Sequence, residues 1–113
     1  MGVDWEFVPT ELLDGVPAEY LTTPVGRQWK LAKELRPGYI VIFKMGDFYE
    51  LFGNDADRAA EVLGLTTFRQ KVSAKCSKTM TRAGFPYHEI DKFLRALVEA
   101  GVGVTVAHQE EPE

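Results

Sequence analysis

The sequence predicts an α/β domain in which a small mixed β-sheet is surrounded by about three α-helices. The chain has 113 residues, a length typical of one domain. Helical and extended patterns alternate along it in the order helix, strands, helix, strands, helix, strand, which is typical of a layered α/β structure. With 45% hydrophobic and 12% aromatic residues, the chain can fill a folded core.

Local signals predict three helices. Thr23 followed by a proline is typical of an N-cap with proline at the first helical position, and the helical pattern ends before Gly38. A second helix is expected over residues 56–63, with Asn54 or Asp55 as its N-cap and a glycine at its end. The third helix has the clearest pattern, because its apolar residues keep helical spacing. These residues are Ile90, Phe93, Leu94, Leu97 and Val98.

The strands are predicted from short runs of β-branched and aromatic residues. Residues 39–44 are apolar on both faces, which is typical of a buried strand. Residues 48–52 alternate in character, so they are expected to form a second strand that pairs with the first. A third strand is expected at residues 65–70, and the last strand at residues 102–107.

Charge is distributed unevenly along the chain. The formal net charge of −4 argues against a general binder of nucleic acids. Residues 1–26 contain acidic but no basic residues, whereas residues 66–88 contain five basic and no acidic residues. The five are Arg69, Lys71, Lys75, Lys78 and Arg82. Residues 71–84 are predicted to be a polar, basic loop that can end in a strand near residues 79–83, and a solvated loop is the ordinary explanation of such a segment.

The sequence disfavours several classes of function. Its single cysteine, Cys76, cannot form an internal disulfide, which favours an intracellular, cytoplasmic protein. No apolar run approaches the roughly 20 residues of a membrane span, and the N-terminus does not have the pattern of a secretory signal. Phosphate-binding loops, hydrolase motifs and Cys-x-x-Cys are absent, and His88 and His108 lie far apart. We therefore predict a protein that is not an enzyme and needs no cofactor or metal.

The stretch "GDFYELF", residues 46–52, combines aromatic and acidic side chains. In an extended chain Phe48, Glu50 and Phe52 share one face, while Tyr49 and Leu51 share the other. A phenyl ring can wedge between bases, and a neighbouring carboxylate can accept a hydrogen bond from a base. Such a pair would respond to an easily deformed step in a duplex. The alternative is that the phenylalanines belong to the core and that Glu50 is solvated.

These residues, together with three further motifs, resemble the N-terminal mismatch-recognition domain of the MutS family of DNA mismatch repair proteins. The resemblance covers about residues 23–109. The four motifs are "TPVGRQW" (23–29), "MGDFYELFGNDA" (45–56), "AGFPYH" (83–88) and "VEAGVGVTVAHQ" (98–109). It implies a small mixed sheet surrounded by helices. It also implies that Phe48 stacks on a mispaired base in the minor groove and that Glu50 hydrogen-bonds to that base. The segment that contains Arg69, Lys71, Lys75 and Lys78 is expected to run near the DNA backbone.

The resemblance also sets the expected organisation and partners. We expect an acidic extension at residues 1–22, the recognition module at 23–109 and an acidic tail at 110–113. Arg82, in Thr81-Arg82, departs from the family, which usually has Pro-Met there. The expected partners are mispaired or bulged duplex DNA, or an RNA–DNA hybrid, and a larger protein such as the rest of a MutS protein. The alternative is a free-standing MutS-like accessory protein that docks on the reverse transcriptase of a diversity-generating retroelement, with Trp5, Phe7 and the acidic N-terminus as its docking segment.

Overall fold

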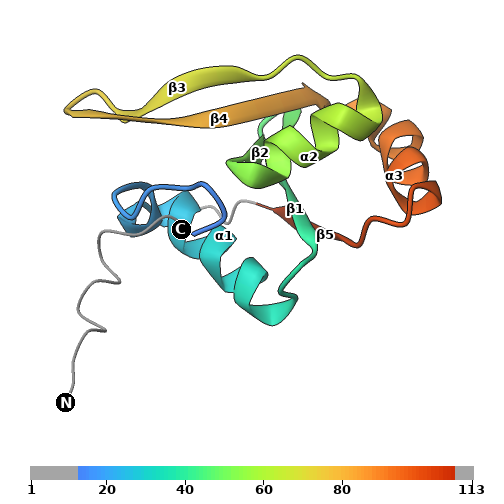
Figure 1. The fold of residues 1–113 in the computed structure, drawn as a ribbon, viewed down its shortest axis with the longest axis horizontal. Helices are drawn as coiled ribbons and strands as arrows, with labels where there is room; N and C mark the ends of the chain where they lie inside the picture. The colour runs from blue at the N-terminus through green and yellow to red at the C-terminus, as the bar shows by residue number, and fades with distance from the viewer. Residues whose placement is uncertain (1–12, 109–113) are drawn as a thin grey trace.

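The computed structural model describes residues 13–108, which form a five-stranded mixed sheet and three α-helices (Figure 1). The sheet order is β3-β4-β2-β1-β5, where β1 pairs in parallel with β5 and the other neighbours are antiparallel. The strands are β1 (Ile40–Met45), β2 (Phe48–Phe52), β3 (Phe68–Ser73), β4 (Cys76–Pro86) and β5 (Val104–His108). The helices are α1 (Pro24–Leu35), α2 (Asn54–Leu63) and α3 (Ile90–Glu99), with short 3-10 turns η2 (Tyr20–Thr22) and η3 (Tyr87–Glu89). The predicted fold class is therefore confirmed. Trp5, Phe7 and the predicted tail at 110–113 lie outside the described residues.

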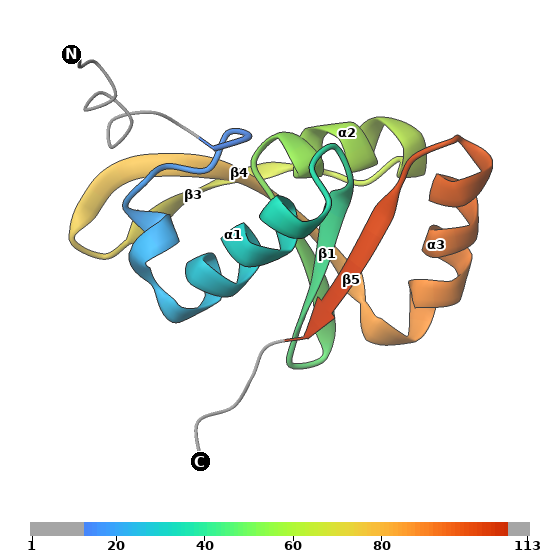
Figure 2. The same ribbon diagram turned by 90° about the horizontal axis from the view of Figure 1, so that it is seen from below.

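The two faces of the sheet have separate cores, and Figure 2 shows α1 and α3 on opposite sides of β1 and β5. One core lies between the sheet and helices α2 and α3. Its strand residues include Ile40, Ile42, Tyr49 and Leu51. The other core lies under α1, and its members include Trp29, Val41, Phe43 and Phe52. Alternate residues of β1 and β2 thus enter different cores, as the period of an extended chain requires.

Helix α1 begins as the sequence predicts. Thr23 is the N-cap, and its Oγ1 accepts a hydrogen bond from the backbone N–H of Gly26 at 3.0 Å. Upstream of this cap, Val16 and Tyr20 are buried beside Trp29 in the core under α1. Residues 13–22 therefore contribute packing to the same body as the helix.

The predicted cap of α2 is wrong. Gly53, not Asn54 or Asp55, occupies the N-cap position, and its carbonyl accepts hydrogen bonds from the backbone N–H groups of Ala56 at 3.0 Å and Asp57 at 3.3 Å. Gly53 has φ +63°, and a Cβ there would collide with the backbone carbonyl of Asp14, so a side chain is excluded from this cap. The helix ends at Gly64, as expected.

Asp55 is instead a buried partner of Lys33. The Nζ atom of Lys33 lies 2.9 Å from Oδ1 of Asp55, and the backbone N–H of Val41 donates to Oδ2 at 2.9 Å. Lys33 also donates to the carbonyl of Tyr39 at 2.7 Å. Burial raises the pKa of the Asp55 carboxyl, while the hydrogen bonds from Val41 and Lys33 oppose that rise. This ion pair joins α1, α2 and the start of β1.

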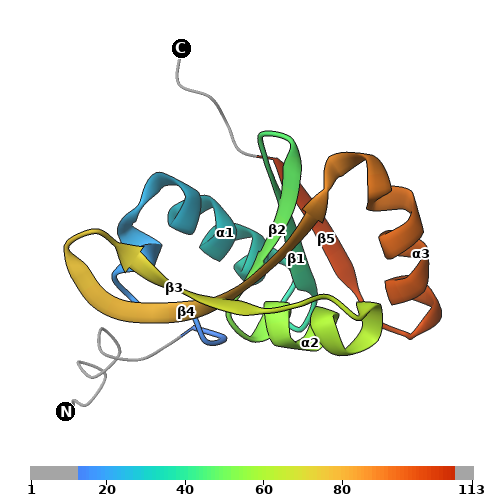
Figure 3. The ribbon, with the colours of Figure 1, turned by 90° about the horizontal axis from the view of Figure 1, so that it is seen from above.

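The segment predicted as a basic loop is in fact a β-hairpin, which corrects the sequence interpretation. Strands β3 and β4 pair in antiparallel register on either side of a turn at residues 74–75. The part of the hairpin next to its turn reaches away from the other three strands, as Figures 1 and 3 show, whereas residues 82–86 of β4 pair with β2. In β3 only Val72 is partly buried, while β4 contributes Met80, Ala83 and Phe85 to the cores. A strand wetted on both faces, as β3 is, lacks the apolar alternation by which strands are recognised.

Candidate nucleic-acid interface

A tight turn between β1 and β2 positions Phe48 and Glu50. Met45 pairs with Phe48, so only Gly46 and Asp47 join the two strands. Gly46 has φ +63°, as two-residue hairpin turns require at this position. The same register places Glu50 opposite Phe43 on β1 and opposite Gly84 on β4. The backbone of both residues is therefore held by strand pairing, with Phe48 at the start and Glu50 in the middle of the central strand.

Residues Phe48, Glu50 and Phe52 share one face of β2, as the alternation predicts, but their burial differs. Phe52 is fully buried against the ring of Trp29 from α1, with ring centroids 6.4 Å apart. The side chain of Glu50 is 25% exposed, and Phe48 at the start of the strand is 49% exposed. Helix α1 thus covers one end of this face and leaves Phe48 and Glu50 accessible.

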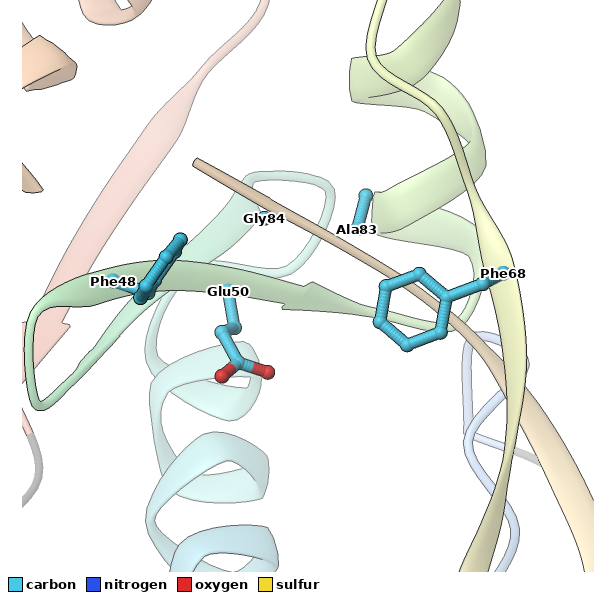
Figure 4. A pocket seen from close by; sticks show the side chains of 5 residues that line it. All are labelled: Phe48, Glu50, Phe68, Ala83 and Gly84. Carbon is cyan, nitrogen blue, oxygen red and sulfur yellow. The ribbon is translucent and has the colours of Figure 1, made fainter. Parts of the chain in front are cut away.

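A pocket of about 310 Å³ opens beside these two residues (Figure 4). It is lined by Phe48, Glu50, Phe68, Ala83 and Gly84. Figure 4 shows the ring of Phe48 on one side, the ring of Phe68 on the other, and the carboxylate of Glu50 between them. The lining thus combines two exposed rings with one hydrogen-bond acceptor.

Arg82 holds the carboxylate of Glu50. Its Nη2 donates to Oε1 of Glu50, and its Nη1 donates to Oε1 of Gln70 at 2.6 Å. The guanidinium carbon also lies 4.8 Å from the ring centroid of Phe52. With a side chain only 12% exposed, Arg82 is fixed by contacts on several sides, although its Nε is buried without a hydrogen-bond partner. The result is a part-buried ion pair next to an exposed phenyl ring.

Arg82 and Phe68 were missed as site residues by sequence reasoning. Two signals could have indicated them. Arg82 stands where the family usually has methionine, and Phe68 is a lone large apolar residue among polar neighbours.

The predicted basic residues do not gather around Phe48 and Glu50. Arg69 and Lys71 alternate with Phe68 along β3 and so point to the other face of the ribbon. Arg69 donates to Oγ1 of Thr79 at 2.7 Å. Lys71 is exposed on the strand, and Lys75 is exposed in the hairpin turn.

Lys78 is engaged with the N-terminal part of the described chain. Its Nζ lies 2.9 Å from Oε2 of Glu19. This hydrogen bond lowers the pKa of the Glu19 carboxyl and raises the pKa of the Lys78 ammonium. Lys78 would have to leave Glu19 before it could contact a phosphate directly.

The described part of the chain contains neither a cluster of metal-ligating side chains nor a membrane-spanning helix. Within residues 13–108, no group of three or more His, Cys, Asp or Glu side chains could hold a metal ion. In the same range, none of the helices is long and apolar enough to cross a membrane.

The fold and the site define a class of protein: a small α/β module that carries a half-exposed phenylalanine and a part-buried carboxylate on one face of its central strand. Residues 23–113 match the family model described as MutS domain I. Three relatives carry the name DNA mismatch repair protein MutS. The one from Rhodopirellula baltica is 46% identical over 90 residues, which are 79% of this chain and 10% of the relative. Those from Flavobacterium psychrophilum and Porphyromonas gingivalis are 38% and 41% identical, over 84% and 80% of this chain and 11% and 10% of their own lengths.

The chain therefore belongs to the MutS domain I family. It spans about a tenth of the length of the curated relatives that it matches.

Proposed function

We propose that this chain is a non-catalytic nucleic-acid-binding module that senses mispaired or deformable duplex DNA. Phe48 would act as the wedge and Glu50 as the hydrogen-bond acceptor. The observation that carries the proposal is the half-exposed ring of Phe48, two residues from a carboxylate on the same face of a rigid strand. The names of the relatives, which are DNA mismatch repair proteins, support DNA as the ligand.

The free-energy cost of inserting Phe48 is lower at a distorted base step than in a regular duplex. Insertion of an apolar side chain between base steps costs a few kcal/mol of unstacking. A mispaired base has already lost part of its pairing, so the cost of displacing it is lowest there. Strand pairing on both sides holds the backbone of Phe48, so only the side-chain torsions of the ring would need ordering on binding.

Glu50 is suited to approach DNA because Arg82 offsets its charge. A bare carboxylate is repelled by the phosphate backbone, whereas an ion-paired carboxylate is close to neutral at a distance. The bond from Arg82 uses one oxygen of Glu50, and the second oxygen can accept a hydrogen bond from a base. Glu50 would thus recognise a displaced base by a hydrogen bond to its exposed edge.

The basic residues would add contacts with phosphates that do not depend on sequence. We assign this role first to Lys75, which is exposed in the turn of the projecting hairpin. Lys71 is exposed on the opposite face of β3 from Phe68, so it would contact phosphates where the duplex passes that side of the hairpin. Arg69 would contact a phosphate through its guanidinium, which now donates to Thr79. Lys78 would do so after it leaves Glu19. Because the net charge is −4, we expect the chain alone to bind weakly and a larger protein, such as the rest of a MutS protein, to supply most of the affinity.

The alternative role beside a reverse transcriptase gains no support from the relatives, whose names mention only DNA mismatch repair. It stays a prediction. Binding to an RNA–DNA hybrid would be the result that favours it.

Fluorescence anisotropy of labelled duplexes at low salt tests the proposal. The ligands are a matched duplex, the same duplex with a G·T mispair, one with a single-base bulge, and an RNA–DNA hybrid. We expect the wild type to prefer the mispair and the bulge, and Phe48→Ala to bind all three DNA duplexes equally. Leu35→Ala, which truncates an exposed apolar residue at the end of α1, is the control. Equal binding of all DNA ligands by the wild type would refute mismatch sensing.

A further inference from the structure

Strand β3 is an edge of the sheet, and its outer side has no strand neighbour among residues 13–108. The sheet order is β3-β4-β2-β1-β5, so β3 pairs only with β4. The register between them is regular over residues 68–71 and shifts between Lys71 and Ser73. The outward N–H and C=O groups of such an edge can pair with an added strand. The regular stretch of β3 therefore offers a site for a short extended segment.

The two faces of this edge differ in chemistry. Arg69 and Lys71 point to one face of β3, whereas Phe68 and Gln70 point to the other. The ring of Phe68 is 50% exposed, although it lies within a sheet. Within residues 13–108, no carboxylate forms an ion pair with Arg69 or Lys71. A segment that complements this edge would carry acidic side chains on one face and apolar side chains on the other.

The acidic N-terminal part of the chain has this pattern. In the stretch "VDWEFV", residues 3–8, the acidic Asp4 and Glu6 alternate with the apolar Val3, Trp5 and Phe7. Alternation with a period of two is typical of a strand, and valine and aromatic residues favour that conformation. Residues 1–12 contain no lysine or arginine. The charge and the spacing of this stretch thus match those of β3.

We infer that residues 3–8 pair with the free edge of β3 as an additional strand of the sheet. The carboxylates of Asp4 and Glu6 would lie on the basic face of the edge. Trp5 and its apolar neighbours would lie on the other face and cover the ring of Phe68. Opposite charges and aromatic rings on neighbouring strands both stabilise a sheet.

The chain is long enough to reach this edge. The carbonyl of Asp14 accepts a hydrogen bond from the backbone N–H of Asn54 at 2.7 Å, just after the end of β2. Counted from β2 across β4 and β3, a strand added to the free edge is three spacings away, or about 14 Å at about 4.8 Å each. The chain from Phe7 to Leu13 can extend over about 20 Å. The linker therefore spans the hairpin without strain.

The described part of the same acidic run already contacts lysines. Among residues 13–26 its acidic members are Asp14 and Glu19. Asp14 lies 3.3 Å from the Nζ atom of Lys33, and Glu19 lies 2.9 Å from that of Lys78 on β4. The contact of Glu19 shows that this run is complementary in charge to the hairpin. Pairing of residues 3–8 with β3 would extend the same complementarity to the other strand of the hairpin.

An occupied edge would also affect DNA binding. Asp4 and Glu6 would compete with phosphates for Arg69 and Lys71, so the N-terminal segment would weaken the binding of every duplex. This consequence rests on the proposed function, whereas the strand pairing does not.

Amide hydrogen exchange of the full chain, followed for each residue by NMR, tests the pairing. The variant Asp4→Lys with Glu6→Lys places positive charges beside the basic face of β3. We expect the amides of residues 68–71 that point to the free edge to exchange about tenfold faster in this variant than in wild type. Glu110→Lys with Glu111→Lys makes the same change of net charge in the acidic tail and should exchange as wild type.

A charge swap provides the second arm of the test. Adding Arg69→Glu and Lys71→Glu to the Asp4→Lys, Glu6→Lys variant should restore slow exchange at the edge of β3. Equal exchange rates in wild type and the Asp4→Lys, Glu6→Lys variant would overturn the inference. Slow exchange that appears only as the protein dimerises at higher concentration would also overturn it, because the added strand would then come from a second copy.

Anisotropy with a matched duplex, measured on the same variants, separates the pairing from its effect on DNA. We expect the Asp4→Lys, Glu6→Lys variant to bind several-fold more tightly than the tail variant of equal charge. Equal affinities would refute the competition with phosphates. If no variant binds any duplex, the proposed function fails, and the exchange rates still decide the pairing.

Discussion

Arg82 on β4 donates a hydrogen bond from its Nη2 atom to Oε1 of Glu50 on β2, and the two residues form a part-buried ion pair beside the exposed ring of Phe48. The residues are 32 positions apart in sequence, and only the pairing of β2 with β4 brings them together. This ion pair holds the carboxylate of Glu50 in place. We propose that the same carboxylate accepts a hydrogen bond from a displaced base. The ion pair also offsets a negative charge at the point where DNA phosphates would approach.

Replacing Arg82 with methionine should weaken the binding of every duplex. The substitution keeps a long side chain but leaves the charge of Glu50 uncompensated near phosphates. At about 1 kcal/mol for unit charges near 4 Å in water, we expect Kd to rise about fivefold at low salt. Anisotropy with matched and mispaired duplexes measures the change.

The double variant Arg82→Met with Glu50→Gln is the matched control for this charge effect. Because it removes both charges, its affinity for the matched duplex should return toward that of wild type. If Arg82→Met alone binds as tightly as wild type, the ion pair does not serve DNA binding.

Removing Asp55 should destabilise the fold strongly. Asp55→Ala leaves the buried Lys33 with only the partly exposed carboxylate of Asp14, 3.3 Å from its Nζ, and leaves the backbone N–H of Val41 without its acceptor. Loss of one member of a buried pair costs up to about 3–5 kcal/mol of unfolding free energy. Urea denaturation followed by circular dichroism measures this loss. Lys30→Ala breaks the exposed pair of Lys30 with Glu34 on the same helix and should cost less than about 0.5 kcal/mol. Similar losses for the two variants would contradict a structural role of the buried pair.

Gly53 should tolerate alanine poorly. The substitution would force a Cβ against the carbonyl of Asp14 at a residue with positive φ. Gly38 has φ +89°, and a Cβ added there would meet no heavy atom within 4 Å, so Gly38→Ala suffers only the backbone cost of about 1–2 kcal/mol. We expect a lower Tm for Gly53→Ala than for Gly38→Ala. Equal Tm values would mean that the loop containing Asp14 yields easily.

Lys71 and Lys75 should contribute to affinity but not to discrimination. Each alanine substitution removes one phosphate contact, so the slope of log K against log salt should fall by about 0.9 per residue. The loss should be equal for matched and mispaired duplexes, because phosphate contacts carry no sequence information. Lys92→Ala on α3 is the control for a general charge effect. A loss of affinity that is confined to the mispaired duplex would mean that these lysines recognise the mispair itself.

Local signals predicted much of the fold from sequence. The cap at Thr23 and the alternation in β2 depend on neighbours within a few residues, and both were confirmed. The cap of α2 was wrong because Gly53 is selected by its contact with the distant residue Asp14. Strands were expected at residues 65–70 and near 79–83, but the loop predicted between them is in fact strand on both sides of a two-residue turn. The residues next to this turn are mostly polar and face water, which hides the period of a strand.

The site was predicted less completely, because two of its residues come from distant parts of the chain. Phe48 and Glu50 were found because they lie two residues apart in one motif. Phe68 and Arg82 join them only through the strand order, which the sequence did not specify. Whether any of the four contacts DNA stays a prediction.

Photochemical crosslinking tests the central claim most directly. A duplex with iodouracil at a G·T-type mispair is irradiated in complex with the protein, and mass spectrometry identifies the crosslinked residue. We predict a crosslink on Phe48 with the mispaired duplex, and little or none when the same base is correctly paired. A crosslink of equal yield on the matched duplex, or one on a residue outside the pocket, would contradict the claim that Phe48 inserts at the mispair.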